Sequence, residues 1–273
     1  MGDAPAGSGA AELRGVMGEA LAEGAPGRAA AFATDATLER FMAASEGDLK
    51  KAQAHLERAL AWRAKQRPWE TACAACAADA RAHNMRVVGT DALGRPVIYF
   101  CFSQSDDRTT EQLVNHLARI LEDLAVWMDS VAAEEGAPTQ WVFAIDFQGY
   151  GFTDVSPSLA SAMSGFLPNY PNRLAKALLI DAPTLFSGTW SLVQGFMTEL
   201  TRAKVQFVAL KDMEAQAGEW LGPELTPWLE RECAESRDKE LAGVKAYWEA
   251  PAGEAGGAGP PGASGGGGGG APR

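Results

Sequence analysis

Residues 169–204 read NYPNRLAKALLIDAPTLFSGTWSLVQGFMTELTRAK, and this stretch decides the fold class of the chain. A tight turn leads into the apolar run Ala177 to Ile180, whose length fits a short buried strand. Asp181 to Pro183 ends that strand, because proline cannot continue a strand's hydrogen-bond ladder. The stretch therefore predicts a turn, a strand and a helix in succession.

The segment 184–200 carries an unusually wide apolar face. Its apolar residues recur at steps of four and three, which is one face of a 3.6-residue period. A helix this apolar either lies inside a large core or covers a lipophilic ligand, and the pattern alone favours the core. The face consists of Phe186, Trp190, Val193, Met197 and Leu200, and Leu185, Leu192 and Phe196 widen it.

Several motifs of this stretch agree in order and spacing with one known pattern. They are Tyr170-Pro-x-Arg173-Leu174, a strand ending in Asp181-Ala-Pro183, the aromatic residues Phe186 and Trp190, and Thr201-x-x-Lys204. Together they resemble the CRAL-TRIO lipid-binding domains, a family that includes phosphatidylinositol transfer proteins and carriers of tocopherol and retinaldehyde. The resemblance covers about residues 36–230 and is strongest over 141–210. It implies a pocket for a lipophilic ligand, which reverses the preference for a dry core.

Apolar runs of strand length alternate with amphipathic helices through the middle of the chain. Helices alternating with buried strands imply an α/β fold, here a CRAL-TRIO-like mixed or mostly parallel sheet covered by helices. Strands are predicted at 86–88, 96–102, 141–147, 177–180 and 205–210, and helices from Trp69 to about His83, from Thr109 or Thr110 to Val131, and from the Ser156-Pro157 cap onward.

A small N-terminal helical lobe is expected before the sheet. Leu38 and Phe41, and then Leu49 and Leu56, lie at helical spacing on either side of a turn at 46–48. The predicted organisation is a disordered Ala/Gly-rich segment at 1–34, the helical lobe at 35–84, a lipid-binding lobe at 85–232, and a C-terminal helix remnant with a Gly-rich disordered tail at 233–273.

The net charge and the hydropathy of the chain exclude several classes of binding partner. The formal net charge of −11 and the absence of a Lys/Arg cluster argue against nucleic acid and against docking on anionic membranes. No run of 18 apolar residues exists, no secretory segment opens the chain, and four scattered cysteines favour a reducing compartment. The expectation is a monomeric cytoplasmic protein that contacts membranes transiently through apolar side chains.

The sequence contains none of the common catalytic motifs. There is no G-x-S-x-G elbow between a predicted strand and a predicted helix, no G-x-x-x-x-G-K-[ST] and no H-E-x-x-H. Asp146 ends a predicted strand, where we expect its carboxylate to accept backbone N–H groups, and Gly149 and Gly151 are interpreted as turn residues. An enzyme is therefore not expected.

Cys73 and Cys76 form a Cys-x-x-Cys pair, which can be a redox couple or half of a metal site. No second pair supplies further ligands, so the two are interpreted as free thiols. His83 and His116 are interpreted as residues on helix surfaces. No metal and no cofactor are expected.

The predicted function is a soluble lipid-binding or lipid-transfer protein that holds a phospholipid or an isoprenoid in an apolar pocket gated by the 184–200 helix. The alternatives are a regulatory module that keeps the fold with a degenerate pocket, and an enzyme whose nucleophile and base are not found. The apolar helix face and the family motifs together give the predicted lipid-binding residues, and the resemblance implies that Thr201 and Lys204 contact a headgroup. The predicted residues are Tyr170, Phe186, Trp190, Val193, Met197, Thr201 and Lys204.

The sequence departs from the family pattern at three places, and these departures affect which lipid is expected to bind. Ser45-Glu46 stands where many phosphoinositide-handling members carry two basic residues, and Asn172 replaces a glutamate. Glu230-Arg231 replaces paired glycines near the end of the resemblance. Inositol phospholipids are therefore not expected to be the preferred cargo, because a glutamate does not complement a headgroup phosphate.

Overall fold

The computed structural model describes residues 8–18, 21, 32–78, 82–132, 134, 136–195, 197–238 and 240. They divide into two compact units. The first unit comprises Met1–Glu70 with Met163–Arg173, and the second comprises Thr71–Ala162 with Leu174–Arg273. The expected Gly-rich tail lies outside the described residues.

The first unit is helical. Thr34 and Asp48 each accept a backbone N–H with their side chains and so start two of its helices, at the positions that the sequence predicts. Its elements are α1 (Ser8–Val16), α4 (Asp35–Ala44), α5 (Leu49–Gln66) and the short 3-10 turns η1 (Pro68–Glu70) and η4 (Leu167–Asn169).

The helix α1 departs from the expectation of a disordered start. Its Leu13 is fully buried, and Met17 just beyond it is 1% exposed. Both belong to one apolar cluster with Leu38, Phe41 and Leu56 of α4 and α5. The helix has only nine residues, two of them glycine, so it depends on burial against its neighbours.

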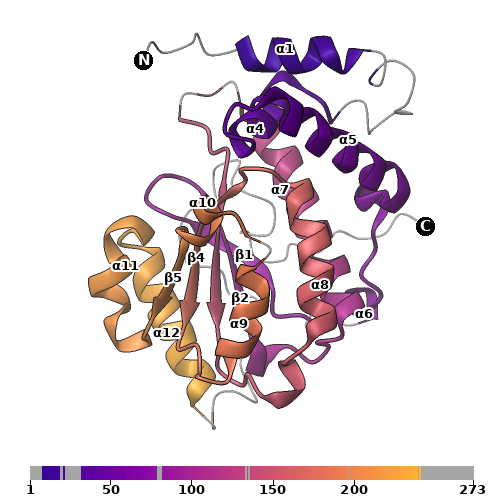
Figure 1. Ribbon diagram of the computed structural model, residues 1–273. Helices are drawn as coiled ribbons and strands as arrows, with labels where there is room; N and C mark the ends of the chain where they lie inside the picture. The colour runs from indigo at the N-terminus through magenta and orange to yellow at the C-terminus, as the bar shows by residue number, and fades with distance from the viewer. Residues whose placement is uncertain are drawn as a thin grey trace, which may run out of the picture. The chain divides into compact units, whose positions relative to one another are not determined.

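The second unit is built on a five-stranded sheet in the order β1-β2-β3-β4-β5 (Figure 1). The first two strands pair antiparallel and the others parallel, which confirms the predicted mixed sheet. Asp91 shapes the β1–β2 turn by accepting the N–H groups of Leu93 and Arg95. The strands are β1 (Arg86–Thr90), β2 (Pro96–Cys101), β3 (Trp141–Asp146), β4 (Leu174–Ile180) and β5 (Val205–Val208).

Helices and short turns connect these strands. Ser156 accepts the N–H of Leu159 and confirms the predicted start of the helix at Pro157. The connecting elements are η2 (Phe102–Gln104), α7 (Thr110–Ser130), η3 (Phe152–Asp154), α8 (Pro157–Phe166), α9 (Phe186–Gln194) and α10 (Glu199–Arg202). The helix α6 (Ala74–Ala78) precedes β1, and η5 (Leu210–Asp212), α11 (Met213–Leu221) and α12 (Leu225–Arg237) follow β5.

One face of the sheet packs against α11 and α12. Tyr99, Val142 and Leu178 on the strands are all fully buried. They share a cluster with residues of both helices, among them Trp228, whose ring lies 5.8 Å from that of Tyr99. This side of the sheet is the dry core of the second unit.

Two predicted helices are shorter than expected. The segment 184–200 forms α9 and α10, because Thr198 caps a new helix by accepting the N–H of Thr201; Phe196 lies outside the described residues. The segment from Trp69 to His83 forms only η1 and α6, and η1 starts at Pro68. The interpretation of His83 and His116 as helix-surface residues is wrong, since His83 is fully buried outside any described helix and His116 is 9% exposed within α7.

Gly149, after β3, is predicted to tolerate no side chain. It has a φ of +84°, and a Cβ there would lie 2.8 Å from backbone atoms of Ser103. Gly149→Ala should lower the free energy of unfolding by at least about 2 kcal/mol, from backbone strain plus this clash. Urea denaturation measures the change.

Gly151 is the matched control two residues away. Its φ is −139°, and a Cβ there would meet no atom within 4 Å. Gly151→Ala should change the stability by less than about 0.5 kcal/mol. Equal effects of the two substitutions would contradict the turn geometry.

Candidate functional site

The second face of the sheet carries two continuous rows of apolar side chains. Side chains alternate between the faces of a strand, so in-register residues of neighbouring strands stand side by side on one face. The row nearer the amino ends consists of Ile98, Phe143, Ala177 and Val205, and the row nearer the carboxyl ends consists of Phe100, Ile145, Leu179 and Phe207.

These rows are incompletely covered, even at the centre of the sheet. Phe143 and Ile145 belong to the middle strand, yet both remain partly exposed, whereas Val142 and Ala144 beside them on the dry face are fully buried. At the edge of the sheet, Phe207 is 48% exposed. A middle strand in a parallel sheet normally hides both faces, so this face offers apolar surface to a ligand.

An aromatic cluster joins this face to α9. Phe186 and Trp190 of α9 contact Phe207 of β5, with ring centroids 6.4 and 5.3 Å apart. Phe186 also lies 4.6 Å from Phe147, just after β3. The cluster comprises Phe100, Phe102, Phe147, Tyr150, Phe186, Trp190 and Phe207.

The helix α9 is apolar without being buried. None of its nine described residues is buried or charged, and Leu192 is 50% exposed. The Tyr150 hydroxyl and the Thr189 hydroxyl lie 3.0 Å apart and connect α9 to the loop after β3. The helix thus rests on the sheet through half-exposed aromatic rings.

The structure brings together part of the predicted site. Phe186, Trp190 and Val193 lie on α9 and are half-buried, and Met197 follows that helix. The two residues assigned to a headgroup lie at the amino ends of the strands. Thr201 belongs to α10, where its backbone N–H donates to Thr198.

Lys204 has a structural contact of its own. Its Nζ donates to the carbonyl oxygen of Leu174 at 2.7 Å, which ties the start of β5 to the start of β4. Partial burial lowers the pKa of Lys204, because desolvation disfavours its charged form. One of its three donors is therefore already used within the protein.

Tyr170 lies in the first unit and not with the α9 residues. Its ring packs 6.3 Å from Trp62 and 5.2 Å from Phe166. Sequence reasoning missed the strand positions Phe143, Ile145 and Phe207. Period-two alternation indicates which residues share a face, but it does not show which face stays open.

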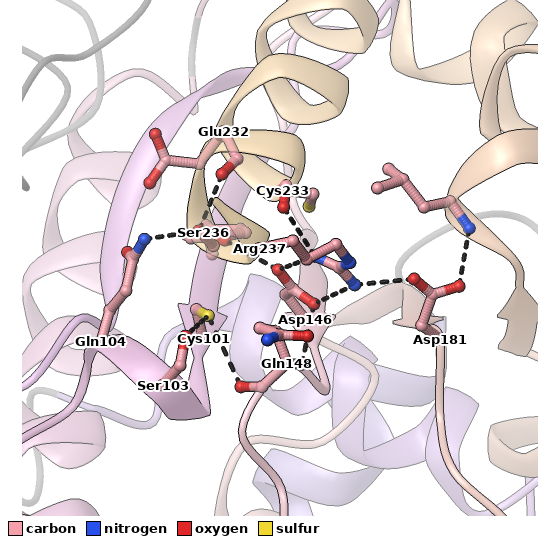
Figure 2. Close-up of polar contacts among 12 residues, drawn as sticks. Cys101, Ser103, Gln104, Asp146, Gln148, Asp181, Glu232, Cys233, Ser236 and Arg237 are labelled. Atoms are coloured by element: carbon pink, nitrogen blue, oxygen red, sulfur yellow. Dashed lines mark hydrogen bonds and ion pairs between the residues drawn. The ribbon is translucent and has the colours of Figure 1, made fainter. Parts of the chain in front are cut away.

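A polar network occupies the carboxyl ends of the strands (Figure 2). Arg237 of α12 donates to both oxygens of Asp146 at 2.8 Å and to Asp181 at 2.7 Å. Asp146 is fully buried and also accepts the N–H of Gln148, which confirms its expected backbone role. Asp181 in turn accepts the N–H of Leu210.

This polar network is suited to stabilising the fold. Burial works against the charge of Arg237, but its hydrogen bonds to Asp146 and Asp181 outweigh that effect and raise the pKa of the guanidinium. Burial likewise raises the pKa of the nearby thiols Cys101 and Cys233, so both stay protonated. Within this network, Asp146 is thus occupied by Arg237, and the two thiols are kept in their less reactive protonated form.

Comparisons with known proteins agree with this architecture. The family model described as "CRAL/TRIO domain" matches residues 83–219, and the chain belongs to this family, whose members bind lipophilic ligands and are generally not enzymes. The CRAL-TRIO domain-containing protein T23G5.2 of Caenorhabditis elegans is 25% identical over 200 residues, covering 62% of this chain. The match takes in 26% of that relative, so the chain spans about a quarter of its length.

A solved structure shows the same fold. The protein of "Crystal structure of Sfh5" superposes with a TM-score of 0.57 at 13% identity, covering 76% of this chain and 80% of that one. Among the helices that the structure describes, none has the length and apolarity needed to cross a membrane.

Arg237 is predicted to be essential for stability. Arg237→Met leaves the fully buried Asp146 without its counter-charge, which should cost about 3–5 kcal/mol of unfolding free energy. Adding Asp146→Asn should recover part of the loss. Urea denaturation of both variants measures this.

Arg119→Met is the control, because the Arg119–Asp123 pair is 3.9 Å long and its side chains are 60% and 58% exposed. Its loss should cost less than about 1 kcal/mol. Similar costs for Arg237→Met and Arg119→Met would show that the network does not hold α12 to the sheet.

Proposed function

We propose that this protein binds a lipophilic molecule on the open face of its sheet and carries it between membranes, with α9 as the gate. The single observation that carries the proposal is the partial exposure of Phe143 and Ile145 in the middle strand. All eight positions of the two rows are apolar, so the ligand has to present a long apolar part.

The free energy of lipid transfer demands such a surface. Moving about 15 methylenes from a bilayer into water costs on the order of 12 kcal/mol at about 0.8 kcal/mol each. A carrier has to return nearly all of this by offering an equally apolar environment. The seven residues of β4 extend over roughly 23 Å at about 3.3 Å each, which is long enough for an extended acyl or isoprenoid chain.

The helix α9 is suited to act as the gate. No described residue of α9 is buried, and the helix ends before Gly195, after which Thr198 starts α10 independently. Segments with few buried contacts open at low free-energy cost. Outward movement of α9 would separate Phe186 and Trp190 from Phe207 and uncover the rows.

The alternative function, a regulatory module with a degenerate pocket, is less well supported. Such a module would fill the face with its own side chains, whereas Ile145 and Phe207 stay accessible. Native mass spectrometry of protein purified from cells separates the two functions. A carrier retains a lipid mass, and a module is a bare chain that takes up no lipid from vesicles.

Membrane contact in this proposal is brief and apolar. Phe152 of η3 is 85% exposed, and Leu192 and Leu200 near the gate are 50% and 59% exposed. A chain with a net charge of −11 gains little from an anionic surface. Its four free cysteines, three of them buried, fit a reducing compartment such as the cytoplasm.

Trp190→Asp should reduce lipid extraction from vesicles at least about tenfold. A carboxylate among the aromatic rings of α9 has to be desolvated when the gate closes, and a loss of about 1.4 kcal/mol already gives that factor. Because Trp190 is only half-buried, the far-ultraviolet circular dichroism should stay unchanged. Transfer of a fluorescent lipid between vesicles is the readout.

Val126→Asp is the matched control, since Val126 is also an apolar helix residue and is 69% exposed on α7. It should extract lipid like the unmodified protein. If Trp190→Asp does so too, α9 is not the gate.

Phosphatidylinositol should not be enriched over phosphatidylcholine when both are offered in equal amounts. Asn172 has a φ of +53°, a conformation that asparagine tolerates better than the glutamate of the family pattern, and Lys204 already donates to Leu174. Native mass spectrometry of the bound lipid gives the ratio. A strong preference for phosphatidylinositol that Lys204→Met removes would overturn this prediction.

A further inference from the structure

Two cysteines and two histidines converge in the second unit, and none of them belongs to the apolar rows. Cys73 immediately precedes α6, Cys76 lies within it, His83 precedes β1, and His116 lies in α7. One potential ligand atom from each residue lies within 4.8 Å of all the others. Cys73, His83 and His116 are buried, and Cys76 is partly buried.

We infer that these four residues form a structural zinc site. Two thiolates and two imidazoles are a common tetrahedral ligand set for Zn²⁺, with bonds of about 2.3 Å to sulfur and about 2.0 Å to nitrogen. A tetrahedron with those bonds separates its ligand atoms by about 3.3–3.8 Å. The Sγ of Cys76 lies 3.2 Å from the Nδ1 of His116, so only the longer separations have to shorten, by about 1 Å.

His116 is already oriented as a ligand. Its Nε2 lies 2.8 Å from the carbonyl oxygen of Met85, an acceptor only, so Nε2 carries the proton and donates. The lone pair is then on Nδ1, the nitrogen that faces Cys76. A hydrogen bond from the second ring nitrogen to a backbone carbonyl is typical of metal-binding histidines.

His83 provides the independent observation. It is fully buried, and neither of its ring nitrogens has a hydrogen-bond partner among the residues that the structure describes. The backbone of Asp107 lies near the ring but makes no hydrogen bond of normal geometry with it. Buried polar atoms without a partner are rare, and a bond to a metal ion would satisfy one of these nitrogens.

The Cys-x-x-Cys segment matches this role. The backbone N–H of Cys76 donates to the Sγ of Cys73 at 3.4 Å, a contact that stabilises a thiolate. Binding of Zn²⁺ releases one proton from each thiol and forms two zinc–sulfur bonds without any change of oxidation state. The resulting complex of one dication, two thiolates and two neutral imidazoles has no net charge, which suits a buried position.

A zinc ion at this site would explain why the short helix α6 is stable. This helix has five residues, none of which is buried, although a helix so short is unstable on its own. Zinc would bind the start of α6 to α7 and to the segment before β1. Two histidines beside the cysteine pair also argue for a metal over a redox couple, which needs only the two thiols.

The full chain, reduced with a phosphine and purified without a histidine tag, tests the proposal. Gel filtration after incubation with Zn²⁺ should leave about one zinc ion per chain, measured by elemental analysis. Replacement by Co²⁺ should give the intense visible bands and the thiolate-to-cobalt absorption of a tetrahedral site. A chain that retains no zinc and shows no thiolate-to-cobalt absorption would overturn the proposal.

Variants assign the ligands. His116→Ala and Cys76→Ser should each weaken zinc binding at least tenfold in competition with a chromophoric chelator, whereas His83→Cys, which keeps a ligand atom, should retain the ion. His55→Ala is the control, because His55 lies in the first unit and its Nε2 forms a hydrogen bond with the carbonyl oxygen of Pro168. Equal binding by the His116 and His55 variants would contradict the assignment, and if a variant fails to fold, the cobalt spectrum of the unmodified chain decides.

Discussion

A middle strand such as β3 is normally covered on both faces, and the residues that the structure describes cover only one of its faces completely. Val142 and Ala144 are fully buried under α11 and α12, while Phe143 and Ile145 point to the opposite face and remain accessible. This asymmetry separates a face that stabilises the fold from a face that is available for binding. Burial on the first side allows the second to stay open, because a sheet with two open faces would not be stable.

The Asp146–Arg237 pair determines where the binding function can lie. Many α/β proteins bind ligands at the carboxyl ends of parallel strands, and here that edge holds the buried Asp146, which is already paired with the partly buried Arg237. The pair fixes α12 to the strand ends and so keeps the dry face closed. The proposed ligand would consequently contact the apolar face of the sheet instead of polar groups at the strand ends.

The sequence predicts those elements whose signals are local. All five strands and the helix start at Ser156 follow from short apolar runs and a cap, and the motifs around Phe186 and Trp190 indicate the family. Burial that depends on distant residues was not predictable: Leu13 is hidden by α4 and α5, Arg237 pairs with Asp146 from 91 positions away, and His83 and His116 meet the cysteine pair only in the folded chain. The break before α10 was missed because the steps of four and three continue across it, although Thr198 is a local helix start.

Because α9 is attached to the sheet without ion pairs, the proposed gate would open more easily at a membrane than in water. The charged pairs that fix other elements, such as Arg237 with Asp146, have no counterpart on α9, whose described residues are all uncharged. Its contacts with Phe147 and Phe207 are between aromatic rings, and separating them in water exposes apolar area at about 25 cal/mol per Å². An acyl chain or the interior of a bilayer replaces that area without this cost. In the proposed function, opening is therefore favoured where a lipid can enter or leave, and α9 would stay in contact with the sheet while the protein diffuses between membranes.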